Sequence, residues 1–202
     1  MKALPWLLLI GCFPLPAAPG DAPRKLETVC VAVEPVVLRT RTSQALKGCK
    51  NTVLSPARET TDGLKILSEE EWAALKMPWE DFLAKAKQAA ARHLATLKPE
   101  IVKDSRGIVE YIKLQSSSPL TSSILLCPEL AKTFVLTLGT PILVVVPDRF
   151  TVYLFPRTSG AFLKHGKELA ALFAEATYPG SDEAFEITET SIKSIGNFTT
   201  RE

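Results

Sequence analysis

The stretch Ile142-Leu143-Val144-Val145-Val146-Pro147-Asp148-Arg149-Phe150-Thr151-Val152-Tyr153-Leu154-Phe155 is the most informative part of the chain. Its first five residues form an unbroken apolar run rich in β-branched side chains, which is typical of a strand buried on both faces. Pro147 and Asp148 favour a turn, and the residues after Phe150 are again strand formers. The stretch therefore predicts an antiparallel hairpin.

Amphipathic helices and further strands surround this hairpin in the sequence. Apolar residues recurring at steps of three and four predict helices over residues 78–97, 122–138 and 162–176, the second with a break at Pro128 and an end at Gly139. Alternating segments within residues 101–114 predict a second hairpin, and Phe185 with Ile187 predicts a last edge strand. These elements give an α+β fold, in which a largely antiparallel sheet of hairpins packs against about three helices.

The length of 202 residues suits one domain with an appendage. Residues 1–20 are interpreted as a removable leader, and residues 21–63 as an irregular, turn-rich segment that contains one strand. Residues 64–195 are predicted to form the α+β core domain, in which Ser68 and Glu71 have the spacing of a capping box at a helix start. Residues 196–202 are predicted to be a tail.

The charge balance excludes one class of partner. The chain has 24 Lys and Arg against 22 Asp and Glu, which leaves a net charge of only +2. A nucleic-acid-binding domain needs a clustered basic surplus, so no nucleic-acid partner is expected. No segment after the N-terminus is long and apolar enough to be predicted as a membrane span.

The first 20 residues resemble an export signal. A basic start at Met1-Lys2 precedes an apolar segment over residues 3–18, and the small residues at 18–20 suit a signal peptidase. Leu9-Ile10-Gly11-Cys12 also resembles the bacterial lipobox, which makes Cys12 a candidate for lipidation. Ordinary secretion, a lipid anchor and a retained buried segment all stay open. In the first two cases the protein is exported, and it is periplasmic, secreted or attached to the envelope only through the lipid.

Beyond the leader the chain has three cysteines, Cys30, Cys49 and Cys127. Three thiols in an exported protein favour one disulfide and one spare cysteine. Cys30 and Cys49 are predicted to form that disulfide, because they are close together in a turn-rich region. Cys127 follows three apolar residues and is interpreted as a small buried hydrophobe.

The sequence contains no motif for catalysis or for a cofactor. It has no phosphate-binding loop, no dinucleotide glycine pattern and no spacing of His and Cys that suits a metal, so neither metal nor cofactor is expected and no catalytic residue is assigned. We therefore favour a non-enzymatic binding or scaffold role, with an unknown protein or a small anionic ligand as the partner. The alternative is a hydrolase, in which Ser122 or Ser123 acts with His93 or His165 after folding brings them together.

Three motifs between residues 66 and 187 resemble the YtpQ-like family of uncharacterised bacterial proteins, which carries a domain of unknown function. They are Trp79-Glu80-Asp81-Phe82-Leu83, Ser122-Ser123-Ile124-Leu125-Leu126-Cys127-Pro128 and Val144-Val145-Val146-Pro147-Asp148-Arg149. The resemblance implies the same order of elements and supplies no activity. The family often has an acid after this Arg, whereas the chain has Phe150, so no role of that carboxylate carries over.

Arg149, preceded by Asp148, is the strongest candidate for a binding residue. A turn between two strands does not require arginine, because Asn or Gly suits the backbone better. The planar guanidinium can hold a carboxylate or a phosphate with two hydrogen bonds. Two interpretations stay open. Arg149 either pairs with an acid of this protein or covers apolar surface with its stem, or it faces a groove and binds an anionic group of a partner.

Overall fold

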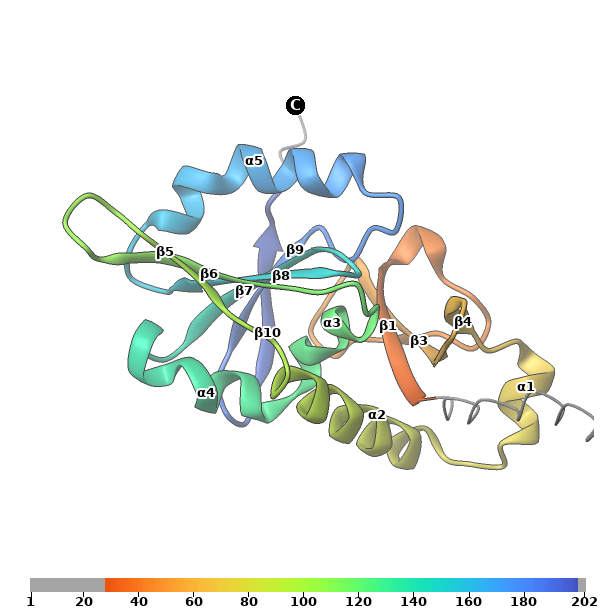
Figure 1. Ribbon diagram of the computed structural model, residues 1–202. Helices are drawn as coiled ribbons and strands as arrows, with labels where there is room; N and C mark the ends of the chain where they lie inside the picture. The colour runs from red at the N-terminus through yellow and green to blue at the C-terminus, as the bar shows by residue number, and fades with distance from the viewer. Residues whose placement is uncertain (1–27, 200–202) are drawn as a thin grey trace, which may run out of the picture.

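The computed structural model describes residues 28–199, which form two antiparallel sheets with helices around them (Figure 1). The strands are β1 (Thr28–Pro35), β2 (Gln44–Ala45), β3 (Thr52–Thr60), β4 (Gly63–Ile66), β5 (Glu100–Lys103), β6 (Val109–Gln115), β7 (Ile142–Asp148), β8 (Thr151–Pro156), β9 (Glu183–Ile187) and β10 (Ile192–Asn197). The helices are α1 (Glu69–Ala74), α2 (Trp79–Leu94), α3 (Leu120–Ser123), α4 (Pro128–Leu138) and α5 (Ala161–Glu175), with 3₁₀ turns at Val36–Leu38 and Ile124–Leu126. The predicted α+β class with antiparallel pairing is confirmed. The predicted leader, with Cys12, lies outside the described residues.

The hairpin predicted from residues 142–155 lies at the centre of the six-stranded sheet. The strand order is β10-β9-β7-β8-β6-β5, and β7 pairs with β8 in a register that places Val144 opposite Leu154. All six residues from Ile142 to Pro147 are buried, as the unbroken apolar run predicts. The second predicted hairpin, β5 and β6, extends this sheet and projects beyond its other strands (Figure 1).

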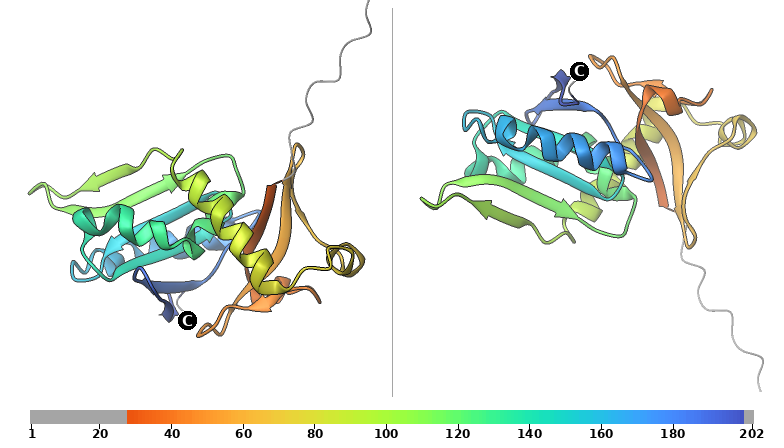
Figure 2. Two further views of the ribbon diagram at one scale, coloured as in Figure 1. Left: turned by 90° about the horizontal axis from the view of Figure 1, so that it is seen from below. Right: turned by 90° about the horizontal axis from the view of Figure 1, so that it is seen from above.

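Helices cover both faces of the six-stranded sheet. Val144 and Leu154 face the side on which α2 and α4 pack, whereas Val145 and Phe155 face α5. The two views in Figure 2 show these layers, with α2 and α4 over one face and α5 over the other. The alternation of strand side chains therefore supplies two hydrophobic cores, one on each face of a single sheet.

The three long helices lie where the sequence predicts them. The capping box of Ser68 and Glu71 is present at the start of α1, and α4 begins at Pro128 and ends before Gly139. Within residues 28–199, no single helix is long and apolar enough to cross a membrane. Residues 120–126 and 128–138 reach that length only as a pair, which is bent by 81°.

Two strands differ from the sequence prediction. β9, which contains Phe185 and Ile187, is not the edge strand, because β10 pairs along its outer side. The register of that pairing shifts between Ser194 and Gly196, and a glycine with polar neighbours hides the strand pattern in the sequence.

The second difference is β3, which lies in the segment that the sequence predicts to be irregular. β3 is nine residues long and pairs with β1 on one side and with β2 and β4 on the other. Pro56 suggests a break in this segment because proline has no N–H to donate. The carbonyl of Pro56 accepts a hydrogen bond from the backbone N–H of Leu67. The nitrogen and carbonyl of one residue in an antiparallel strand point to the same side, so the Pro56 nitrogen points away from β1, into the gap between β2 and β4. The missing donor therefore removes no bond to β1.

The predicted disulfide between Cys30 and Cys49 is wrong, because both residues are free thiols in the structure. Cys30 lies opposite Ala57, and the β1–β3 ladder ends where Pro35 lies opposite Thr52, which is the end near Cys49. Five residues of strand therefore separate Cys30 from that end, or about 17 Å at about 3.4 Å per residue. A disulfide needs a Cα separation below about 7 Å, so closeness in sequence is misleading here.

The thiols are expected to react with iodoacetamide in a defined order. Burial raises the pKa of Cys30, Cys49 and Cys127 to about 12, so each is a poor nucleophile at neutral pH. Cys49 is the only one of the three that is not fully buried, so it should be modified first in the native protein. All three should react in denaturant, with or without prior reduction. Peptide mass spectrometry measures this, and a linked Cys30–Cys49 peptide would contradict it.

Candidate functional site

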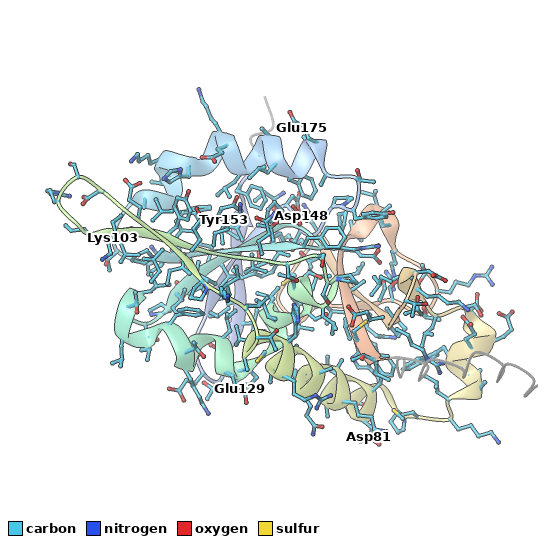
Figure 3. All side chains as sticks on the ribbon, in the orientation of Figure 1. Asp81, Lys103, Glu129, Asp148, Tyr153 and Glu175 are labelled. Carbon is cyan, nitrogen blue, oxygen red and sulfur yellow. The ribbon has the colours of Figure 1, made fainter. Side chains whose placement is uncertain are left out.

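The predicted binding residues Asp148 and Arg149 lie in the turn between β7 and β8, where the two sheets meet (Figure 3 labels Asp148). Asp148 Oδ1 accepts a hydrogen bond of 2.6 Å from the backbone N–H of Phe150, which fixes the turn. The side chain of Arg149 extends to the other sheet, where its Nη2 donates a hydrogen bond of 2.5 Å to Glu34 Oε1 on β1. The side chains of Arg149 and Glu34 are only 12% and 4% exposed.

The guanidinium of Arg149 is therefore held by an acid of the same chain. Its Cζ atom also lies 5.0 Å from the centre of the Tyr178 ring, and its backbone N–H donates to the carbonyl of Tyr178. These contacts match the first of the two sequence interpretations, in which Arg149 pairs with an acid of this protein. The ion pair joins the N-terminal sheet to the central hairpin of the other sheet.

Glu183, at the start of β9, makes a second connection between the sheets. Its carboxylate is buried and accepts hydrogen bonds from the backbone N–H groups of Lys50 and Asn51, at 3.0 and 3.3 Å, and from the hydroxyls of Thr52 and Ser194, at 2.5 and 2.8 Å. Burial by itself would raise the pKa of Glu183, but these donors outweigh it and lower the pKa below the usual value for glutamate. Sequence reasoning missed this residue, because its acidic neighbours make it resemble an exposed position.

The serines and histidines of the hydrolase hypothesis do not come together as predicted. Ser122 Oγ donates to the carbonyl of Pro119 at 3.3 Å, and Ser123 Oγ donates to the carbonyl of Val31 at 2.5 Å. Both hydroxyls are buried and point to backbone oxygens rather than to a base. His165 lies on α5, packs edge-on against Tyr111 and contacts Glu110 and Glu168. None of these contacts involves Ser122 or Ser123.

His93 instead meets two hydroxyls that the sequence did not nominate. Its Nε2 lies 3.1 Å from Thr121 Oγ1 and 3.3 Å from Ser116 Oγ, and these two oxygens are 2.7 Å apart. Burial lowers the pKa of His93, while the nearby Glu59 carboxylate opposes this shift. The imidazole is therefore biased toward the neutral form, which can accept a proton from a hydroxyl. Alternation and spacing could not indicate this cluster, because the loop after β6, with Ser116, and helix α3, with Thr121, must fold against α2 to make it.

A hollow of about 230 Å³ lies where four separate segments converge. The segments are the loop between β2 and β3, the middle of α2, the start of α4 with the residues before it, and the turn between β9 and β10. Most of its wall is apolar, formed by Leu46, Leu125, Leu126, Ile187 and Ile192, and two lysines, Lys47 and Lys87, also line it. Cys127 is part of the wall, with its thiol 3.0 Å from Glu129 Oε2. The hollow combines apolar surface with basic groups, which suits a ligand better than a reaction.

Comparison with known proteins gives no relative from which a site could be transferred. Among the described residues 28–199, no group of three or more His, Cys, Asp or Glu side chains is arranged to hold a metal ion. The resemblance to the YtpQ-like family stays a prediction. No protein-family model, no curated protein and no solved structure matches this chain.

Proposed function

We propose that this protein is a non-enzymatic binding protein that acts outside the cytoplasm and holds a small ligand in the hollow beside α2. The observation that carries the proposal is the composition of that hollow, an apolar wall with Lys47 and Lys87 beside it. Ligand sites in proteins are concave and largely apolar, with a few polar groups that orient the ligand.

The use of the other polar groups supports a binding role. Among the described residues, the two buried carboxylates, Glu34 and Glu183, are both engaged in joining the two sheets, Glu34 through its ion pair with Arg149. Ser122 and Ser123 donate to backbone carbonyls, so neither is positioned as a nucleophile.

The export part of the proposal rests on residues 1–20, and mass spectrometry of the mature N-terminus tests cleavage and lipidation of Cys12 together.

Replacement of Thr190 by tryptophan should abolish ligand binding. Thr190 lies on the exposed β9–β10 turn and lines the hollow, so the large ring should fill the space without disturbing the core. Saturation-transfer NMR against a mixture of small acids, alcohols and amines measures binding. The wild-type protein should give signals from at least one class, and these should be lost in Thr190→Trp. Identical signals from the two proteins would overturn the proposed function.

One observation favours hydrolysis as a second candidate, the contact of Ser116 with His93. A serine nucleophile needs a base within hydrogen-bond reach, and this pair supplies one. Covalent labelling of Ser116 by a fluorophosphonate, lost in His93→Ala, would support an enzyme over a binding protein. Absence of labelling in the wild-type protein would remove this candidate.

A further inference from the structure

We infer that the ligand of this hollow is an anion with a short aliphatic tail, of which a medium-chain carboxylate is the chemical type. The inference rests on the proposed function and adds the ligand class to it. Two features of the hollow carry it, the unpaired positive charge and the apolar wall, and its volume limits the length of the tail.

The positive charge of the hollow comes from Lys47 and Lys87. Within the described part of the chain, the ammonium group of neither lysine forms an ion pair or a hydrogen bond. Lys47 comes from the loop before β3 and Lys87 from α2, so folding brings two like charges to one hollow from segments 40 positions apart. An anion in the hollow would therefore be attracted by both charges.

The one acid of the hollow and two of its three hydroxyl groups are already engaged. Glu189 is the one acid of the lining, and it lies 4.0 Å from Lys132, outside the lining. The hydroxyls of Thr188 and Ser191 are 2.8 Å apart and bond each other across the β9–β10 turn. Apart from the hydroxyl of Thr190, the two lysines are the groups with donors to spare, and their charge selects an anion.

The apolar wall selects the rest of the ligand. Leu125, Leu126 and Ile187 belong to the core that lies under α2 and α4 and form the floor of the hollow, while Leu46 and Ile192 pack against that core and stay partly exposed. An alkyl chain placed there would gain about 0.8 kcal/mol for each CH₂ group removed from water. A fully polar anion such as phosphate would leave Leu46 and Ile192, the partly exposed apolar residues of the lining, in contact with water.

The volume of the hollow sets the size of the ligand. At about 230 Å³ it lies below the range of about 300–1,000 Å³ that is typical of sites for drug-sized molecules. A short tail fits this space, whereas a long-chain lipid would extend far beyond it. Octanoate is therefore a suitable probe, with octan-1-ol and octylamine as neutral and cationic molecules of the same length.

The test is a calorimetric titration of the full chain with these three probes. Octanoate should bind, and octanol and octylamine should bind at least tenfold more weakly, because only the anion meets the two lysines. The double variant Lys47→Met/Lys87→Met should weaken octanoate binding by about tenfold or more, since it removes both charges and keeps apolar side chains of similar length. Lys85→Met is the matched control, because Lys85 lies on the exposed face of α2 and does not line the hollow.

The outcomes separate the ligand class from the proposed function. If octanol or octylamine binds as tightly as octanoate, or if the double lysine variant binds octanoate like the wild type, the anionic class is wrong although the hollow still binds ligands. If none of the three probes binds, the anionic class also fails. The proposed function fails separately, if Thr190→Trp loses no ligand of any class. Shifts of the methyl resonances of Leu125, Leu126 and Ile187 on addition of octanoate would place it in the hollow, and shifts elsewhere would overturn the inference.

Discussion

Replacement of Arg149 by alanine is expected to lower the free energy of unfolding by about 3–5 kcal/mol, the range for breaking a buried ion pair from one side. The variant leaves the Glu34 carboxylate buried, with only 4% of its side chain exposed and no partner for Oε1. It also removes the cation that lies over the Tyr178 ring. Denaturation by urea measures the change as a lower midpoint at an unchanged slope.

The matched control is Arg157→Ala, because Arg157 also pairs with a glutamate of a strand, at 2.9 Å from Glu186, but is 50% exposed. An exposed pair contributes little, so this variant should lose at most about 1 kcal/mol. Arg149→Lys keeps the charge without the planar fork and should fall between the wild type and Arg149→Ala. Removal of Glu34 together with Arg149 should cost less than the sum of the two single changes, because no charge is then left unpaired. Equal losses for Arg149→Ala and Arg157→Ala would contradict the role of Arg149.

Replacement of Glu183 by alanine is expected to cost about 3 kcal/mol or more, because each buried donor left without an acceptor costs about 1–3 kcal/mol. The variant leaves the N–H groups of Lys50 and Asn51 and the hydroxyl of Thr52 without the carboxylate that they share. Glu186→Ala, three positions along the same strand, removes a less buried acid and should lose at most about 1 kcal/mol.

The contribution of Glu183 should also depend on pH. The donors hold the pKa of Glu183 in the folded protein below the value of about 4.3 for an unfolded glutamate. The stabilisation is therefore complete well above about pH 4.3, and it is lost as the pH falls below that value and through the lower pKa of the folded state. The stability difference between the wild type and Glu183→Gln should be constant near neutral pH and shrink in acid. A difference that grows below pH 4 would show that the assigned direction is wrong.

Local patterns in the sequence were enough for most helices and strands. The helix that begins at Trp79 follows from apolar residues at steps of three and four, and the hairpin of β7 and β8 follows from two apolar runs around a turn. Such patterns can be recognised in the sequence because they depend mainly on residues that are near one another in the chain. The same reasoning failed at β3, where Pro56 suggested a break although its missing donor faces a gap between β2 and β4.

The candidate sites could not be predicted from local patterns, because they are formed by contacts between residues that are far apart in the sequence. The sequence singled out Arg149 as a candidate binding residue and left open whether an acid of this protein or a partner's anion holds it, because its partner Glu34 lies 115 positions away in the chain. Ser116 and His93 come from different elements, and the hollow takes residues from four segments between Leu46 and Ile192. Cys30 and Cys49 illustrate the converse, because the ladder of β1 and β3 separates residues that are close in sequence.

The sequence by itself therefore determined the α+β class, the long helices and the central hairpin, because the periodicity of apolar side chains is a local property that burial of one face requires. Only the tertiary structure decided the partners of the charged and hydroxyl groups. Glu34 and Glu183 are buried acids whose placement is tolerable only because Arg149, Thr52 and two backbone N–H groups reach them across the junction of the sheets. Which donors arrive there depends on how one sheet packs against the other, and that packing brings together residues more than a hundred positions apart.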